Sequence, residues 1–149
     1  MTAQASERFL EGGEAYPLLM EPLRPLLEQR SLDIRSFCQL SATHCYRGYV
    51  ASWLVQEGKL FLHEIEVIAL LGRAPVPDEL KSMLFEITAS QAFPIFASWF
   101  NGNLRIGLGK RYDYRHAFGI YPEERVIEIK DGVAIWESRR RNANPSTDG

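Results

Sequence analysis

Tight two-residue turns interrupt stretches of alternating apolar residues in this chain, and they constrain its fold more than any other feature. Asn101-Gly102 is the clearest of them, because both residues readily adopt the positive φ angles of a type I′ turn. Residues equidistant from such a turn lie opposite each other on one face of the hairpin. Counting outward therefore predicts an apolar face with the pairs Trp99–Leu104, Ala97–Ile106 and Ile95–Leu108.

The same count applies to the turns Asp131-Gly132 and Glu57-Gly58. The predicted pairs are Ile129–Ala134 and Ile127–Trp136 around the first turn, and Val55–Leu60 and Trp53–Leu62 around the second. Around Glu57-Gly58 the other face is equally apolar, with Leu54 opposite Phe61. A strand pair that is apolar on both faces is expected at the centre of a sheet.

Helical patterns are short in this chain. Residues 77–85 have an acidic first turn, followed by Leu80 and Leu84 at a spacing that places them on one helix face. Prolines interrupt residues 16–25, which leaves a single helical turn at residues 26–29. The elements together predict a mainly β fold (α+β at most), with a curled antiparallel sheet or barrel-like meander of hairpins and one short helix.

The length of 149 residues suits one domain. Residues 1–15 contain Gly12-Gly13 and few large apolar side chains, so we expect a loose N-terminal arm. Residues 16–138 are expected to form a single β-rich domain. The polar residues 139–149 are expected to be a disordered tail.

Charge and cysteine content narrow the class of protein. The 17 Lys and Arg and 19 Asp and Glu residues give a net charge of −2, which argues against a surface built throughout for nucleic acid. The two cysteines are too few for a disulfide framework. The start lacks the pattern of a secretory signal, and no apolar run is long enough to cross a bilayer. We therefore expect a cytoplasmic protein without membrane contact.

The segment 41–49 concentrates reactive side chains, namely His44, Cys45 and Arg47. A thiol beside an imidazole suggests a nucleophile, but neighbouring side chains of an extended chain point to opposite faces. An enzyme site would therefore need a distant residue, His63 or His116, beside this segment. The alternative is that Cys45 is a small buried residue and that His63 is a hydrogen-bonded core residue. The spacing of these residues matches no zinc motif, so we expect no metal and no cofactor.

Residues 105–116 are the best candidate for a ligand face. Arginines alternate there with aromatic side chains, and the candidate binding residues are Arg105, Arg111, Tyr112, Tyr114, Arg115 and His116. Aromatic rings beside arginines can stack on bases and neutralise phosphates, as single-stranded nucleic-acid binders do. The same alternation also suits a core face backed by a solvated charged face.

The run Ser41-Ala42-Thr43-His44-Cys45-Tyr46-Arg47-Gly48-Tyr49, which continues as Val50-Ala51-Ser52-Trp53, resembles a group of small bacterial proteins of unknown function. Those proteins show a similar S-x-T-x-C-[WY]-R-G-[YF]-[IV]-x-T-W run, then a G-x-L-x-L strand. Residues 99–106 are similar to their second hairpin. This chain departs from their pattern at Ser52, where threonine is usual, and at Tyr46, where tryptophan is usual. The resemblance implies a bacterial, cytosolic, β-rich domain and supplies no reaction.

Three functions remain open at this point. The first is a non-enzymatic binding or regulatory module that engages another protein, such as an immunity- or antitoxin-like partner. The second is a small enzyme with a site around His44, Cys45 and Arg47, and the third is a single-stranded nucleic-acid binder through residues 105–116. The first is favoured, because the sequence shows no assembled catalytic set and small folds host many functions.

Overall fold

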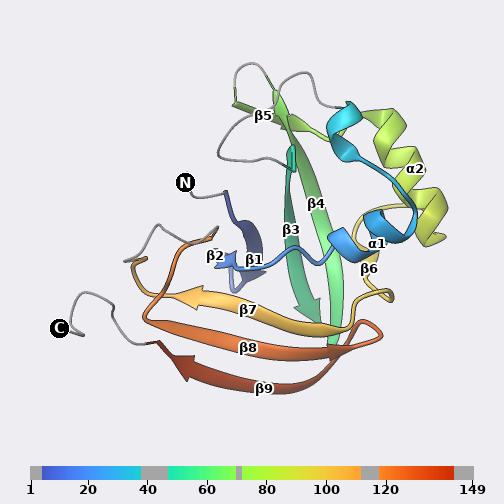
Figure 1. The fold of residues 1–149 in the computed structure, drawn as a ribbon. Helices are drawn as coiled ribbons and strands as arrows, with labels where there is room; N and C mark the ends of the chain where they lie inside the picture. The colour runs from blue at the N-terminus through green and yellow to red at the C-terminus, as the bar shows by residue number, and fades with distance from the viewer. Residues whose placement is uncertain (1–4, 38–46, 70–71, 112–117, 143–149) are drawn as a thin grey trace.

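Strands closed into a ring dominate the computed structural model, which describes residues 5–37, 47–69, 72–111 and 118–142 (Figure 1). The ring runs in the order β3-β1-β2-β7-β8-β9-β4 and closes where β4 pairs with β3. The bounds of these strands are β1 Glu7–Glu11, β2 Glu14–Leu18, β3 Tyr49–Gln56, β4 Lys59–Ala69, β7 Gly102–Leu108, β8 Glu123–Lys130 and β9 Val133–Arg141. All of the pairings in the ring are antiparallel except that of β1 with β3. The predicted mainly β, barrel-like fold is confirmed.

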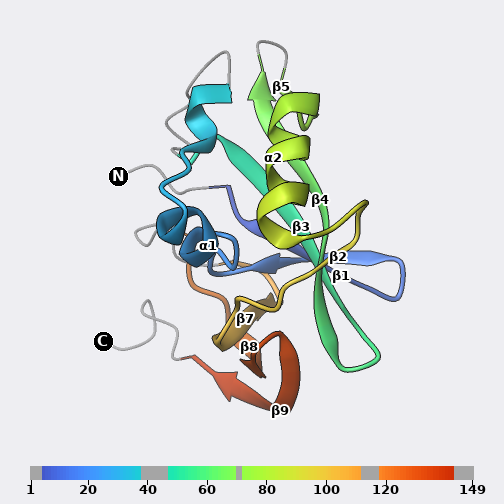
Figure 2. The same ribbon diagram turned by 90° about the vertical axis from the view of Figure 1, so that its right-hand side faces the viewer.

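The remaining elements are short and lie along the ring. β5 (Gly72–Pro75) and β6 (Ile95–Phe96) both pair with β4. Helices α1 (Arg24–Gln29) and α2 (Asp78–Thr88) lie on the same side of the ring, together with the 3-10 helix η1 (Ile34–Phe37) (Figures 1 and 2). The helix predicted at residues 77–85 is α2, which buries Leu80 and Leu84. No helix in the described part of the chain is long and apolar enough to span a membrane.

The interior of the ring is one apolar core. Trp53, Leu62 and Leu104 are fully buried there, and they come from three different strands. The two helices add Leu26 and Leu84 to the same cluster. A core shared by so many strands fixes the positions of the surfaces described below.

The register of β3 and β4 agrees with the predicted one close to the turn and then departs from it. Val55 lies opposite Leu60 and Trp53 opposite Leu62, as the Glu57-Gly58 turn predicts. A bulge between Ser52 and Trp53 then makes Ser52 face Glu64. His63 is the extra residue and is exposed, so the prediction of a core histidine is wrong.

The register of β8 and β9 also agrees with the predicted one close to the turn and departs from it after a bulge. Ile129 lies opposite Ala134 as predicted, but a bulge shifts the register between Glu128 and Ile129. Trp136 therefore faces Glu128 instead of Ile127, and its side chain is exposed.

The predicted Asn101-Gly102 hairpin is wrong. Residues 95–96 pair with β4, whereas β7 begins at Gly102 and pairs with β8 along its whole length. Asn101 accepts a hydrogen bond from the Asp131 N–H through Oδ1 (2.8 Å), so it joins the Asp131-Gly132 turn. Non-local pairing has overridden the local turn preference, although Ala97, Leu104 and Ile106 are buried as expected.

Both ends of the domain also differ from expectation. Residues 5–15 of the predicted arm are not loose, because Gly12-Gly13 is the turn between β1 and β2, and Phe9 is buried. Residues 139–141 are not part of a disordered tail, because they pair with β8 as the end of β9. Residues 143–149 lie outside the described part of the chain.

Candidate functional site

A cavity of about 580 Å³ lies between α1, η1 and the start of β3. Its wall combines apolar side chains, such as Leu27, Leu32 and Phe118, with several charged ones. This volume is typical of ligand pockets. Of the residues predicted for an enzyme site, Arg47 lines the cavity, whereas His44 and Cys45 lie outside the described residues.

Arg47 is held by carboxylates and aromatic rings. Its side chain is 10% exposed, and Nη2 donates to Glu7 Oε2 at 2.9 Å, while Nε lies 3.7 Å from Glu21 Oε1. The guanidinium carbon is 5.4 Å from the ring centre of Tyr49 and 5.7 Å from that of Phe118. Two carboxylates and two aromatic rings thus stabilise one cation at the base of the cavity.

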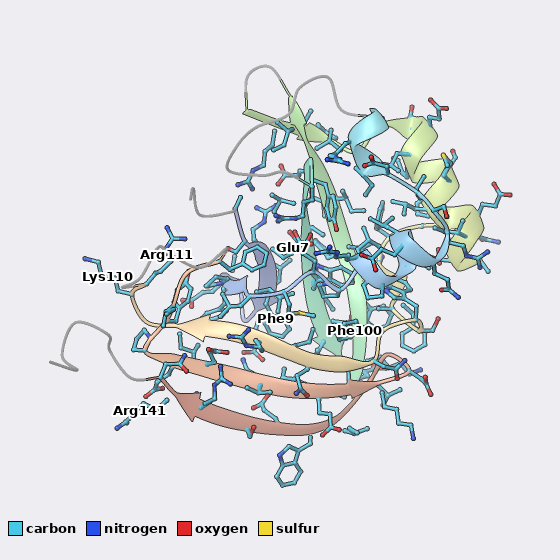
Figure 3. The ribbon with its side chains drawn as sticks, in the orientation of Figure 1. Glu7, Phe9, Phe100, Lys110, Arg111 and Arg141 are labelled. Carbon is cyan, nitrogen blue, oxygen red and sulfur yellow. The ribbon has the colours of Figure 1, made fainter. Side chains whose placement is uncertain are left out.

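Glu7 is the partner that sequence analysis missed. It is fully buried on β1, and its Oε2 also accepts the Ala51 N–H at 2.7 Å (Figure 3). Burial raises the pKa of Glu7, although Arg47 and the Ala51 hydrogen bond act against this shift. Because these bonds join β1 to the segment that starts β3, the cluster fixes the parallel pair of the ring.

A basic groove of about 540 Å³ lies between β1, β2 and the end of β7. Arg8, Lys110 and Arg111 line it together with Tyr16 and Tyr121. Lys110 and Arg111 project from the end of β7 (Figure 3). The groove includes Arg111 of the predicted ligand face, while Tyr112, Tyr114, Arg115 and His116 lie outside the described residues.

Arg105 has a different environment from Arg111. Its Nε donates to Glu124 Oε1 at 2.7 Å and its Nη2 to Oε2 at 3.1 Å. Arg140 and Asn142 also donate to Glu124, which is 2% exposed. Burial disfavours ionisation of this carboxyl, but the hydrogen bonds outweigh it and lower its pKa to about 2. Arg105 therefore belongs to a network that joins β7, β8 and the end of β9.

Strand β9 presents a surface that sequence analysis did not identify. Within the described ranges, the large hydrophobic side chains that remain exposed are Val133 (39%), Ile135 (51%) and Trp136 (68%), all on β9. β9 pairs with β8 throughout, but β4 pairs with it only at Val133. We call residues 135–141 the β9 edge, since no described strand pairs with their outer side. The arginines that follow Ile135-Trp136 were the available signal, because exposed edge strands often carry cations.

A cleft of about 310 Å³ lies beside the β9 edge. Phe9, Val55 and Ile127 form its apolar part, and Trp136 also lines it. Arg125 lies over the Phe9 ring, 5.8 Å from its centre, and donates to Glu11 and Glu137. The cleft therefore combines an apolar floor with a charged rim, next to an exposed tryptophan.

Within the described ranges, no three His, Cys, Asp or Glu side chains are grouped so that they could hold a metal ion. No family model, curated protein or solved structure matches the chain. The resemblance to the small bacterial proteins therefore stays a prediction, and function is argued from the surfaces themselves.

Proposed function

We propose that this protein is a non-enzymatic binding module that engages a protein partner through the β9 edge. The observation that carries the proposal is the exposure of Val133, Ile135 and Trp136 on one strand that has no second neighbour among the described strands beyond its start. An immunity- or antitoxin-like role, as expected from the sequence, is one case of this proposal.

The backbone of the β9 edge supports this function. An unpaired strand edge offers a row of N–H and C=O groups to an added strand, which is a common mode of peptide recognition. Side-chain pockets then supply specificity, and the cleft beside Trp136 is such a pocket. Tryptophan is also the residue type most enriched among side chains that dominate binding energy.

Selection of peptides from a random display library on the folded protein tests the proposal. We expect extended peptides to be selected, and Trp136→Ser to weaken their binding about tenfold or more, as loss of a dominant interface side chain does. Lys130→Ser is the matched control, because Lys130 is exposed on β8 and lies outside the β9 edge. Peptides that bind the Trp136→Ser variant as tightly as the wild type would contradict the proposal.

A second candidate function is the binding of an anionic ligand in the basic groove. Lys110, Arg111 and Arg8 line it beside Tyr16, and cations beside an aromatic ring are a combination that binds single-stranded nucleic acids, although Arg8 also pairs with Glu66. Tyr121, which also lines the groove, is buried. Titration with a single-stranded oligonucleotide at increasing salt tests it. Binding that weakens steeply with salt and is lost in Lys110→Ala/Arg111→Ala would favour this function, and binding unchanged in that variant would eliminate it.

The enzyme alternative has the least support from geometry. Arg47 is already bound to Glu7 and near Glu21, and His63 is on the surface. His44 and Cys45 lie outside the described residues, so this alternative stays a prediction.

A further inference from the structure

We infer that the β9 edge pairs with the β9 edge of a second copy of this chain, in an antiparallel register centred on Ser138. This inference rests on the proposed function, because it names the occupant of the same surface. It predicts a symmetric dimer in which the two rings join through one continuous sheet.

Symmetry restricts the registers that such a dimer can adopt. In an isologous dimer of antiparallel strands the twofold axis passes between the two copies of one residue, which therefore lie opposite each other. The residues of the β9 edge that can occupy this position near its middle are Glu137, Ser138 and Arg139. Placing Glu137 or Arg139 on the axis brings two like charges directly opposite each other, which destabilises a strand pair.

The register centred on Ser138 instead brings opposite charges together. Glu137 then lies opposite the partner's Arg139, and the symmetry produces this pair twice. Trp136 lies opposite the partner's Arg140, which is 56% exposed although it donates to Glu124 at 3.0 Å. The exposed part of this guanidinium allows a cation–π contact. Ile135, the extra residue of the bulge in β9, lies at the end of this ladder near the partner's Arg141, whose methylene groups can cover it. The dimer thereby covers the two largest exposed apolar side chains of β9.

The charged groups of this register are accessible in the single chain. Glu137 is 52% exposed, although it accepts a hydrogen bond from Arg125 at 2.7 Å. Arg139 is 69% exposed, and its nearest carboxylate, Glu123, is 3.7 Å away. Both side chains therefore have room to reach a second copy while they keep the contacts within the chain.

A cysteine cross-link tests the register directly. Opposite residues of an antiparallel pair have Cα atoms roughly 4.5–5.5 Å apart, within the range of a disulfide. We expect Ser138→Cys to give a covalent dimer under mild oxidation. Arg141→Cys is the matched control on the same strand, because its two copies would lie six residues apart, roughly 20 Å. Wild type treated in parallel controls for Cys38 and Cys45.

Charge reversal tests the pairing without a covalent bond. In sedimentation equilibrium we expect Glu137→Arg and Arg139→Glu each to weaken dimerisation about tenfold or more, and the double variant to restore it. Circular dichroism of each variant verifies that the fold is retained. A wild type that stays monomeric to about 1 mM, or equal cross-linking of Ser138→Cys and Arg141→Cys, would overturn the inference.

The peptide selection separates this failure from a failure of the proposed function. A monomeric wild type whose selected peptides still depend on Trp136 would overturn the second copy and retain the protein-binding function. A monomeric wild type that selects no such peptides would overturn both.

Discussion

Strands β3 and β9 belong to the same ring but differ in their strand neighbours and in their burial. β3 has a strand neighbour on each side, β1 and β4, and its first five residues are all buried. Among the described strands, β9 has one neighbour for most of its length, and eight of its nine residues are exposed. Composition explains part of this difference, because β9 ends in Glu137, Ser138 and three arginines, whereas β3 is mostly apolar. It does not explain why Trp136 is 68% exposed while Trp53 is fully buried. The described strands leave the outer side of β9 open after its start, so Trp136 is available to a partner.

The two buried glutamates also differ from each other, in the direction in which the fold shifts their pKa values. Glu7 on β1 is fully buried, and the described donors that reach it are Arg47 and the Ala51 N–H. Glu124 on β8 accepts hydrogen bonds from three side chains, including Arg105 and Arg140. Burial dominates at Glu7 and raises its pKa, whereas the donors dominate at Glu124 and lower its pKa.

The largest expected effect separates two tryptophans. Trp53→Ala removes a fully buried side chain on β3 and should lower the free energy of unfolding by about 3–5 kcal/mol. Trp136→Ala removes a side chain that is 68% exposed and should change it by less than about 0.5 kcal/mol. Urea denaturation of both variants measures the difference. Equal losses would mean that β9 is as essential to the core as β3.

Removal of the buried ion pair comes next. Glu7→Ala leaves the Arg47 guanidinium and the Ala51 N–H without this acceptor, and we expect a loss of about 3–5 kcal/mol. Glu66→Ala is the matched control, because Glu66 pairs with Arg8 and Arg73 near the surface, where ion pairs contribute up to about 1 kcal/mol. Similar chemical denaturation curves for the two variants would show that the Glu7 cluster does not hold β1 to β3.

Two turn glycines test how firmly β9 is anchored where it begins. Gly58 and Gly132 have similar φ angles, +74° and +80°, so alanine at either position is strained by about 1–2 kcal/mol. A Cβ at Gly58 meets nothing within 4 Å, whereas one at Gly132 would lie 2.6 Å from the Ala97 carbonyl oxygen. Gly132→Ala should therefore lose about 1–3 kcal/mol more than Gly58→Ala in thermal unfolding. Equal losses of stability would mean that the start of β9 can shift away from Ala97 at little energetic cost.

Local chemistry explains which parts of the fold the sequence predicts. The pairs next to Glu57-Gly58 and Asp131-Gly132 depend on two turn residues and their neighbours, and they agree with the structure. The bulges that follow depend on how each strand twists against the rest of the ring, which no short segment encodes. The hairpin predicted at Asn101-Gly102 does not form because β7 gains pairing along its whole length with β8.

The candidate sites follow the same rule. Arg47 stands out in the sequence, but its partner Glu7 lies 40 residues away and is brought to it by the pairing of β1 with β3. The exposure of Trp136 depends on the bulge opposite Glu128 and on the departure of β4 after Val133. A period-two pattern predicts that alternate residues share a face, but it does not predict whether anything covers that face.

The last comparison concerns the pH dependence of stability, where the two glutamates should act in opposite directions. The pKa of Glu124 falls from 4.5 to about 2 on folding, so its stabilisation is complete above pH 4.5 and is lost as the pH falls toward 2. The pKa of Glu7 is raised above 4.5, so the folded state binds the proton more tightly, and stability is lost as the pH rises from 4.5 through the folded pKa.

Urea denaturation of wild type, Glu7→Gln and Glu124→Gln between pH 2 and pH 8 measures both pH dependences. The stability advantage of wild type over Glu124→Gln should grow from pH 2 to pH 4.5, and its advantage over Glu7→Gln should shrink above pH 4.5. If both stability advantages changed in the same direction with pH, the fold would not shift the pKa values of Glu7 and Glu124 in opposite directions.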